Sequence, residues 1–351
     1  MAAEAQSQLL SSIEKEDERG EKRTTIIIGL SGPSSSGKTT LARLLRTIFG
    51  LFGAFILHED DFYYPDDKIP VTTTSSGQLI QDWDTIGAID LPCLSSALSY
   101  VRQHGALPPR LKSKEDQNEA TDSGVNAAQV ERWRTKVGER VSEQGSDRQR
   151  LGRGGDPTLV FLEGFLLYAP PAAEDPDHIL RLIHNQIDLH LFLPAPYNLV
   201  KSRREARSGY MTIGPAPTPS RKPDGDDADE KSKWETADLE KGNDGDLPRN
   251  FWTDPPGYVD DIVWPRYVED HAWLLLPQDE VKEVESREEC GPPQARKALP
   301  TDELLKIVGQ GANVRTDAGV FVAPGHGMRP MTEIFDWAVK EILKYLALEG
   351  E

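Results

Sequence analysis

A glycine-rich loop, set between an apolar run and a helical pattern, constrains the fold of this chain more than any other feature. Residues 32–39 read Gly-Pro-Ser-Ser-Ser-Gly-Lys-Thr, which is the pattern of a phosphate-binding loop. The apolar run before it predicts a buried strand, and leucines at helical spacing after it predict a helix. In that setting the backbone N–H groups point at phosphate oxygens, Lys38 reaches the β- and γ-phosphates, and the Thr39 hydroxyl ligates Mg²⁺. The loop therefore predicts a nucleoside-triphosphate-binding protein.

The composition argues against several other classes of protein. The formal net charge of −18 is opposite in sign to that of a duplex-binding protein, so we expect no nucleic-acid partner. Cys93 and Cys290 are far apart and form neither a disulfide framework nor a zinc motif. No run of about 18 apolar residues is present, so we expect no membrane partner. Residues 1–23 lack the apolar core of a signal peptide and carry too many acids for a transit peptide, which predicts a cytoplasmic protein, with the nucleus left open.

The order of the predicted elements indicates an α/β fold. Alternating strands and helices are typical of a parallel sheet covered by helices, with right-handed crossovers. We expect strands at 25–30, 54–58, 159–162, 189–193 and 320–323, and helices at 38–49, 92–104, 197–207, 260–275 (interrupted at Pro265) and 331–346. The prediction is a P-loop NTPase-type parallel sheet of about five strands flanked by helices. Ligands of such sheets collect beyond the carboxyl ends of the strands, so the residues that follow each strand are candidates for the site.

Four polar segments interrupt this pattern. They are a flexible charged tail at 1–23 and insertions at about 108–157, 212–249 and 278–299. Such compositions bury too little apolar surface to offset the entropy of ordering the chain, so we expect loops or disorder there. A short charged helix around 127–137 is expected inside the first insertion. We therefore expect one domain over residues 24–351, carrying three insertions and no large assembly beyond a monomer or weak dimer.

Two carboxylates stand where phosphoryl-transfer chemistry needs them. Asp60 follows the second expected strand, and an aspartate facing the γ-phosphate can accept the proton of the attacking hydroxyl. The alternative is that Asp60 and Asp61 cap a helix or lie in a solvated turn. Glu163 ends an otherwise apolar strand, where a buried carboxylate needs a cation or hydrogen-bond donors. Mg²⁺ is one such partner, and a nearby arginine is the alternative.

A cluster of arginines and an aromatic-acidic pair complete the candidate residues. Arg203 and Arg207 are four residues apart and share a face of the expected helix, with Arg204 about 100° away. Two arginines on one face can clamp a transferring phosphoryl group as a lid, although a basic run on a helix is as often a solvated surface. Trp83 and Asp84 can stack a heterocycle and accept bonds from ribose hydroxyls. Taken alone this last signal is weak, because Trp is usually core and Asp usually surface.

Together these motifs resemble the nicotinamide riboside kinases, which belong with the uridine kinase and pantothenate kinase group of P-loop kinases. The specific parts are Glu163-Gly-Phe-Leu-Leu and Pro256-Gly-Tyr-Val-Asp-Asp-Ile-Val-Trp-Pro, whereas the phosphate loop is generic. The resemblance covers about residues 24–107, 158–211, 251–275 and 319–346. The long polar insertions suit fungal members of the family.

The resemblance implies a role for each matching position. Asp60 is the catalytic aspartate, and Glu163 lies near Mg²⁺ and the reacting groups. Asp84 and Arg204 hold the ribose hydroxyls, while Trp83 and Tyr210 stack on the nicotinamide ring; the spacing to Tyr210 is one residue longer here than in the family. The implied sets are nucleotide-binding Gly32, Ser34, Ser35, Ser36, Gly37, Lys38, Thr39, Thr40, Arg203 and Arg207; catalytic Asp60, Lys38 and Glu163; substrate-binding Asp60, Trp83, Asp84, Arg204 and Tyr210; and metal-binding Thr39 and Glu163.

The resemblance also implies the reaction. ATP, with Mg²⁺, would phosphorylate the ribose 5′-hydroxyl of nicotinamide riboside, with nicotinic acid riboside left open as a further substrate and GTP left open as donor. Two electron-rich rings around the cationic pyridinium suit this substrate, since cation–π contacts contribute about 0.5–2 kcal/mol. The alternatives are a uridine/cytidine or pantothenate kinase and a nucleotide-dependent regulator without turnover.

Overall fold

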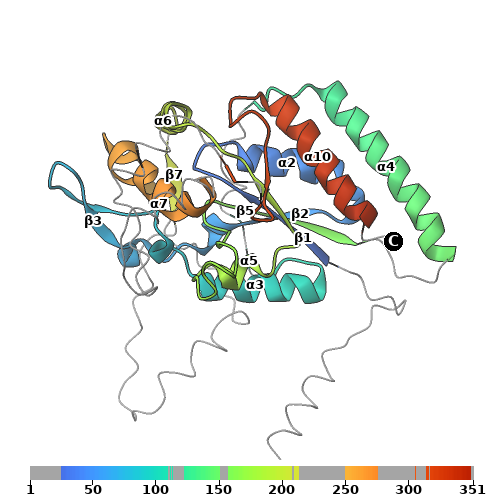
Figure 1. Cartoon of the computed structure of the whole chain (residues 1–351), viewed down its shortest axis with the longest axis horizontal. Coiled ribbons are helices and arrows are strands. Elements are labelled where there is room, and N and C mark those ends of the chain that lie inside the picture. The colour runs from blue at the N-terminus through green and yellow to red at the C-terminus, as the bar shows by residue number, and fades with distance from the viewer. Residues whose placement is uncertain are drawn as a thin grey trace, which may run out of the picture.

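A five-stranded parallel sheet forms the centre of the molecule (Figure 1). Its strands are β1 (Thr25–Ser31), β2 (Phe55–His58), β5 (Thr158–Gly164), β6 (Leu189–Phe192) and β9 (Phe321–Val322), in the spatial order β2-β5-β1-β6-β9. Each neighbouring pair is parallel. The strands β1 and β5 are buried along their whole length, as expected for strands covered on both faces. The parallel sheet of about five strands is therefore confirmed.

This computed structural model describes residues 25–109, 111, 113, 122–150, 157–207, 209–212, 250–275, 305, 314–315 and 317–348, with the backbone alone for 140–150, 250 and 348. The expected tail at 1–23, the insertion at 278–299 and nearly all of the insertion at 212–249 lie outside these residues. None of the helices in the described part combines the length and the apolarity that a bilayer span requires.

Helices cover both faces of the sheet (Figure 1). Because side chains alternate along a strand, Ile26, Ile28 and Leu30 of β1 face one layer and Ile27 faces the other. The first layer contains α2 (Lys38–Ile48), α4 (Ala127–Arg150) and α10 (Met331–Leu348), and the second contains α3 (Leu91–His104) and the short α5 (Arg181–His184). The sheet is thereby buried on both sides, which leaves the carboxyl ends of its strands as the place for a site.

The first insertion contributes to the core, which the sequence prediction missed. Helix α4 runs to Arg150 rather than ending near Val137. It buries Trp133 and Val137 in the same apolar cluster as α2 and α10, and the Trp133 indole donates a hydrogen bond to Asp336 of α10. The expectation that this insertion buries too little apolar surface is therefore wrong for α4, because two apolar residues in a charged helix are enough to pack it against α2 and α10.

The last expected helix before the third insertion changes its helical type next to Pro265 and is not broken there. A π-helical turn, Val259–Val263, leads into α7 (Trp264–Leu275), and Pro265 lies in the first turn of α7. A proline is tolerated in the first turn of an α-helix, because the N–H groups there have no acceptor within that helix. Residues of this turn and of α7 belong to the same apolar cluster as α3, so they brace the sheet beside the strand ends.

Two small antiparallel pairs were not predicted. Strand β3 (Val71–Thr73) pairs with β4 (Leu79–Gln81), and β7 (Tyr210–Thr212) pairs with β8 (Asn250–Trp252). The second pair closes the ends of the 212–249 insertion, and it follows α6 (Tyr197–Glu205) directly in the chain. It brings Trp252 opposite Tyr210 in the strand register.

Candidate active site

The phosphate loop has the backbone shape that its glycines predict. Gly32 and Gly37 have φ angles of 151° and 101°, in the region that favours glycine. A Cβ at Gly32 would lie 2.2 Å from the carbonyl oxygen of Leu193, so only glycine fits between β1 and the end of β6. Lys38 opens α2, and its Nζ donates to the Pro33 carbonyl oxygen at 3.0 Å. The lysine ammonium is therefore held across the loop, where a bound phosphate would lie.

A pocket opens between this loop, the ends of β2 and β5, and the β7–β8 pair. It brings together most of the residues that the sequence singled out. Those lining it are Ser34, Ser35, Gly37, Lys38, Thr39, Thr40, Asp60, Trp83, Asp84, Glu163, Arg204, Arg207 and Tyr210. Gly32, Ser36 and Arg203 are not among the lining residues. The expectation that strand ends converge on one site accounts for this grouping.

Glu163 meets donors rather than an arginine. Its Oε1 accepts from the Thr39 hydroxyl at 3.1 Å and lies 2.8 Å from His58 Nδ1. Burial alone would raise the pKa of Glu163, but the hydrogen bond and charge of His58 and the charge of Lys38 outweigh it and keep the pKa below its ordinary value. Burial lowers the pKa of Lys38, and Glu163 and Asp60 oppose that shift. The carboxylate is thus kept ionised beside the loop lysine.

The side-chain oxygens of Thr39 and Glu163 are suited to bind a magnesium ion. In the described part of the chain no group of three or more His, Cys, Asp and Glu side chains is arranged to hold a metal. Thr39 Oγ1 and Glu163 Oε1, however, are adjacent oxygen atoms at the phosphate loop that could both ligate a metal. Mg²⁺ commonly takes one or two protein oxygens and completes its shell with water and substrate phosphates. These two side chains are therefore suited to a magnesium ion that arrives with a nucleotide.

Asp60 lies in a short 3₁₀ turn, Glu59–Phe62, immediately after β2. It is partly exposed and lines the pocket, whereas the adjacent Glu59 is fully buried. Glu59 accepts hydrogen bonds from the backbone N–H groups of Phe165 and Leu166 at 2.7 and 3.1 Å. Burial raises the pKa of Glu59 to about 7, in spite of these two donors. The turn thereby fixes the ends of β2 and β5 to each other and presents Asp60 to the pocket.

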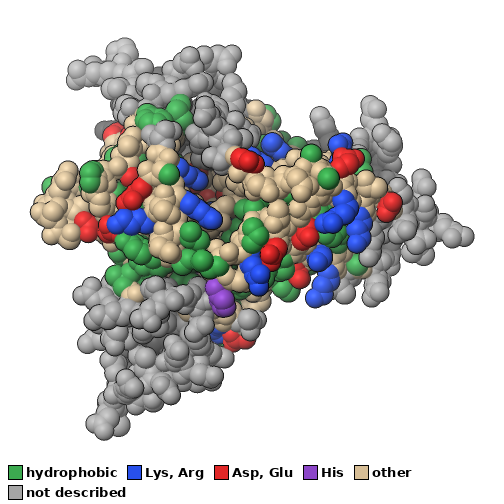
Figure 2. Space-filling view, turned by 90° about the horizontal axis from the view of Figure 1, so that it is seen from above, with side chains coloured by type: hydrophobic (Ala, Val, Ile, Leu, Met, Phe, Trp, Pro, Cys, Tyr) green, Lys and Arg blue, Asp and Glu red, His purple; other side chains and the backbone are tan. Residues whose placement is uncertain are grey.

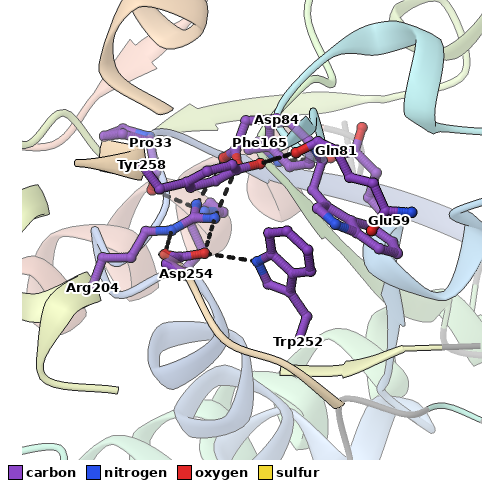
Figure 3. A network of polar contacts seen from close by, with 11 residues as sticks. Pro33, Glu59, Gln81, Asp84, Phe165, Arg204, Trp252, Asp254 and Tyr258 are labelled. Carbon is purple, nitrogen blue, oxygen red and sulfur yellow. Dashed lines mark hydrogen bonds and ion pairs between the residues drawn. The ribbon is translucent and has the colours of Figure 1, made fainter. Parts of the chain in front are cut away.

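Arg204 is the centre of a buried ionic cluster in the wall of the pocket (Figure 3). Its Nη1 and Nη2 donate to the two carboxylate oxygens of Asp84 at 2.7 and 2.9 Å, and its Nε donates to Asp254 at 2.7 Å. Burial raises the pKa of Asp84, and Arg204 opposes the shift. The bidentate geometry fixes the direction in which the Asp84 oxygens face the pocket.

Aromatic rings surround this cluster. Trp83 is only 6% exposed. The centre of its ring lies 5.4 Å from that of Tyr63, in an edge-on arrangement, and 5.8 Å from that of Trp252. Its backbone N–H donates to the hydroxyl of Tyr258 at 3.0 Å. Trp83 is therefore both a core residue and a wall of the pocket, so the two interpretations of its sequence position are not exclusive.

The arginines after β6 separate into different environments. Arg203 is exposed and its Nη1 donates to the Ser35 carbonyl oxygen of the phosphate loop at 3.3 Å. Arg207 follows the end of α6 rather than lying within it, so it does not share a helix face with Arg203 as expected. The guanidinium carbons of Arg207 and Arg204 lie 5.3 and 5.2 Å from the centre of the Tyr210 ring. Tyr210 thus contacts both arginines that line the pocket.

Comparison with known proteins identifies the family to which this site belongs. A nicotinamide riboside kinase of Schizosaccharomyces pombe is 32% identical over 257 residues, covering 73% of this chain and 84% of the relative. The chain belongs to the nicotinamide riboside kinase family. The nicotinamide riboside kinase of Saccharomyces cerevisiae is 26% identical, covering 73% of this chain and 82% of that relative. No protein-family model matches the chain. Among solved structures, a possible uridine kinase from Bacillus stearothermophilus aligns over 59% of this chain and 94% of its own, with 15% identity and a TM-score of 0.29.

Three residues of this nicotinamide riboside kinase family member were not assigned a role from the sequence. His58 is one, although the strand register sets it directly opposite Glu163. Asp254 and Trp252 are the others, and they stand just before the Pro-Gly-Tyr motif and just after the second insertion. For Asp254 and Trp252 the only signal in the sequence was that they lie close to the motif and to the insertion. The contacts that these residues make form only when the chain folds.

On the face seen in Figure 2, acidic and basic side chains of the described residues are interspersed. That face of the family member therefore lacks the continuous basic surface that a duplex-binding protein presents.

Proposed function

We propose that the protein transfers the γ-phosphoryl group of ATP to the ribose 5′-hydroxyl of nicotinamide riboside, giving the mononucleotide and ADP. The observation that carries the proposal is one pocket lined by two unlike groups of residues. One group, here called the phosphate end, is the phosphate loop with Lys38, Thr39 and Glu163. The other, here called the riboside end, is the Asp84–Arg204 pair with the aromatic rings around it. The relatives named nicotinamide riboside kinase support the same substrate.

The phosphate end suits a nucleoside triphosphate. We assign Gly32, Gly37 and the serines between them to the phosphates, together with Lys38 and Thr40. Arg203 contacts the loop and Arg207 lines the pocket, so both are within reach of a bound nucleotide. Mg²⁺ bound between Thr39, Glu163 and the phosphates would neutralise charge that develops during transfer.

The riboside end suits a ribose carrying a flat cationic ring. Each Asp84 oxygen has a lone pair left after binding Arg204, so it can accept a hydrogen bond from a ribose hydroxyl. Arg204 holds Asp84 in that orientation. Trp83 and Tyr210 supply electron-rich ring surface for the pyridinium. Asp60, on the pocket wall, is the proposed acceptor of the 5′-hydroxyl proton.

The proposal extends to features beyond the pocket. The five strands of the sheet come from positions between 25 and 322, which supports a single P-loop kinase domain. We place the product in NAD salvage and the protein in the cytoplasm, with the nucleus open, and we expect a monomer or weak dimer.

The test is ADP release with Mg²⁺-ATP and one acceptor at a time: nicotinamide riboside, nicotinic acid riboside, uridine or pantothenate at equal concentration. A clear preference for the pyridine ribosides is expected. Preference for uridine or pantothenate would refute the substrate assignment and retain the phosphoryl-transfer assignment. ATP binding without turnover of any acceptor would support a nucleotide-dependent regulator. Replacing ATP with GTP in the same assay decides the donor.

A further inference from the structure

Trp252 lies in the part of the pocket where the pyridinium ring is expected. It lines the pocket, and its ring lies 5.8 Å from that of Trp83 at an interplanar angle of 51°. Trp83 also lines the pocket but is only 6% exposed, so most of its ring is covered by protein and only a small part faces a ligand. Trp252 is partly exposed in the same pocket. Trp252 therefore contributes accessible indole surface to this part of the pocket, although it lies outside the motifs recognised in the sequence.

Three contacts hold Trp252 in place, and Figure 3 shows the surroundings of its ring. Its backbone pairs with that of Tyr210 across the β7–β8 ladder. Its indole Nε1 donates to Asp254 Oδ1 at 2.9 Å, and its ring meets Tyr258 edge-on at 5.8 Å. A ring fixed at both its backbone and its polar edge loses little conformational entropy when a ligand arrives. Trp252 is therefore preorganised as a binding surface.

The charge beside Trp252 favours a cation. Asp254, which accepts the indole hydrogen bond, also accepts from Arg204 Nε at 2.7 Å, and Arg204 in turn binds Asp84. Two carboxylates against one guanidinium leave this trio with a net negative charge. The face of an indole also attracts cations more strongly than that of tyrosine or phenylalanine. The ring surface and the charge next to it thus favour the same kind of ligand.

We propose that Trp252 is a specificity-determining residue that recognises the positive charge of the pyridinium ring, as a wall of the ring site in addition to Trp83 and Tyr210. This inference rests on the proposed function, since it concerns how that substrate is selected. It separates a cationic riboside from a neutral one of similar shape. Neither the phosphate loop nor the ribose-binding pair Asp84 and Arg204 supplies such a contact with the charge of the ring.

The test compares two ligands that differ in ring charge. Nicotinamide riboside and its neutral dihydropyridine form are titrated calorimetrically into the full-length protein, alongside ATP. With Trp252→Leu we expect the Kd of the cationic riboside to rise about tenfold, which is equivalent to about 1.4 kcal/mol and within the range of cation–π contacts. The Kd values of the neutral riboside and of ATP should change by less than about threefold. For Trp252→Phe, which keeps an aromatic ring, the Kd of the cationic riboside should lie between the values for the unmodified protein and for Trp252→Leu.

Phe251→Leu is the matched control. Phe251 is the neighbour of Trp252 on β8, is 55% exposed and is not among the residues that line the pocket. It should leave all three Kd values unchanged, and thermal unfolding of each variant checks that the fold is retained. Equal weakening of both ribosides in Trp252→Leu would overturn charge recognition, and unchanged binding of both would overturn the assignment altogether. If the unmodified protein binds ATP and neither riboside, the proposed function fails first and this inference fails with it.

Discussion

Replacing Arg204 by methionine should strongly destabilise the protein, because it removes the single cation of a buried cluster. The side chains of Arg204, Asp84 and Asp254 are 5%, 8% and 13% exposed. Methionine retains the apolar volume of the arginine stem but leaves two carboxylates without their partner. Removing one member of a buried ion pair costs about 3–5 kcal/mol, which is a large share of the stability of an ordinary domain.

Urea unfolding at pH 7 and pH 5 measures this loss. The loss should be larger at pH 7. Without Arg204 nothing opposes the burial that raises the pKa of Asp84, so protonation of Asp84 at pH 5 relieves part of the cost. Adding Asp84→Asn and Asp254→Asn to Arg204→Met should recover more than half of the lost stability, while riboside phosphorylation stays absent. Arg203→Met, exposed on the same helix, should change stability by less than about 0.5 kcal/mol. A loss below about 1 kcal/mol for Arg204→Met, or no recovery in the triple variant, would refute the reasoning.

Three further substitutions test other parts of the site. Asp60→Asn should leave ATP binding nearly intact and lower kcat by at least about 100-fold, as single-turnover kinetics would reveal; unchanged turnover would remove Asp60 from the mechanism. Trp83→Ala should weaken riboside binding without affecting ATP binding, and because the ring is buried it should also cost about 3 kcal/mol of stability; equal loss of both ligands would make Trp83 purely structural. The raised pKa of Glu59, about 7 against an ordinary 4.5, means that the folded state binds more protons than the unfolded state between these values, so stability should fall as pH rises through that window. Glu59→Gln should flatten the dependence of Tm on pH between about 5 and 7.5, and an unchanged slope would contradict this assignment.

The central sheet could be predicted from the sequence because its strands are continuous apolar runs. A strand buried on both faces, such as β5, shows no alternation and is recognisable from its composition. The short β3–β4 pair could not be recognised in this way, because Val71 and Leu79 are 60% and 72% exposed and nothing in the pattern of these strands requires pairing. Helix α4 was underestimated for a related reason: its charged composition conceals Trp133 and Val137, whose burial depends on two other helices.

The site could be predicted in part, because topology brings strand ends together whatever the details of packing. Glu163 and Asp60 were expected at strand ends for this reason, and both line the pocket. The partner of Glu163 was not, since His58 is recognisable only once β2 and β5 are aligned in register. Asp254 and Trp252 take their positions from Arg204 and from the β7–β8 pair, and no local pattern of residues encodes either contact.

The β7–β8 pair has a consequence for how the second insertion can vary. Thr212 and Asn250 are partners in the strand register, so the chain leaves the pocket wall and returns to it at points about one strand spacing, or about 5 Å, apart. Whatever length of chain connects these two points, Tyr210 and Trp252 keep their places on the paired strands. Residues 213–249 could therefore be exchanged for a two-residue turn of the Asn-Gly kind, which would give a shorter kinase with the same pocket.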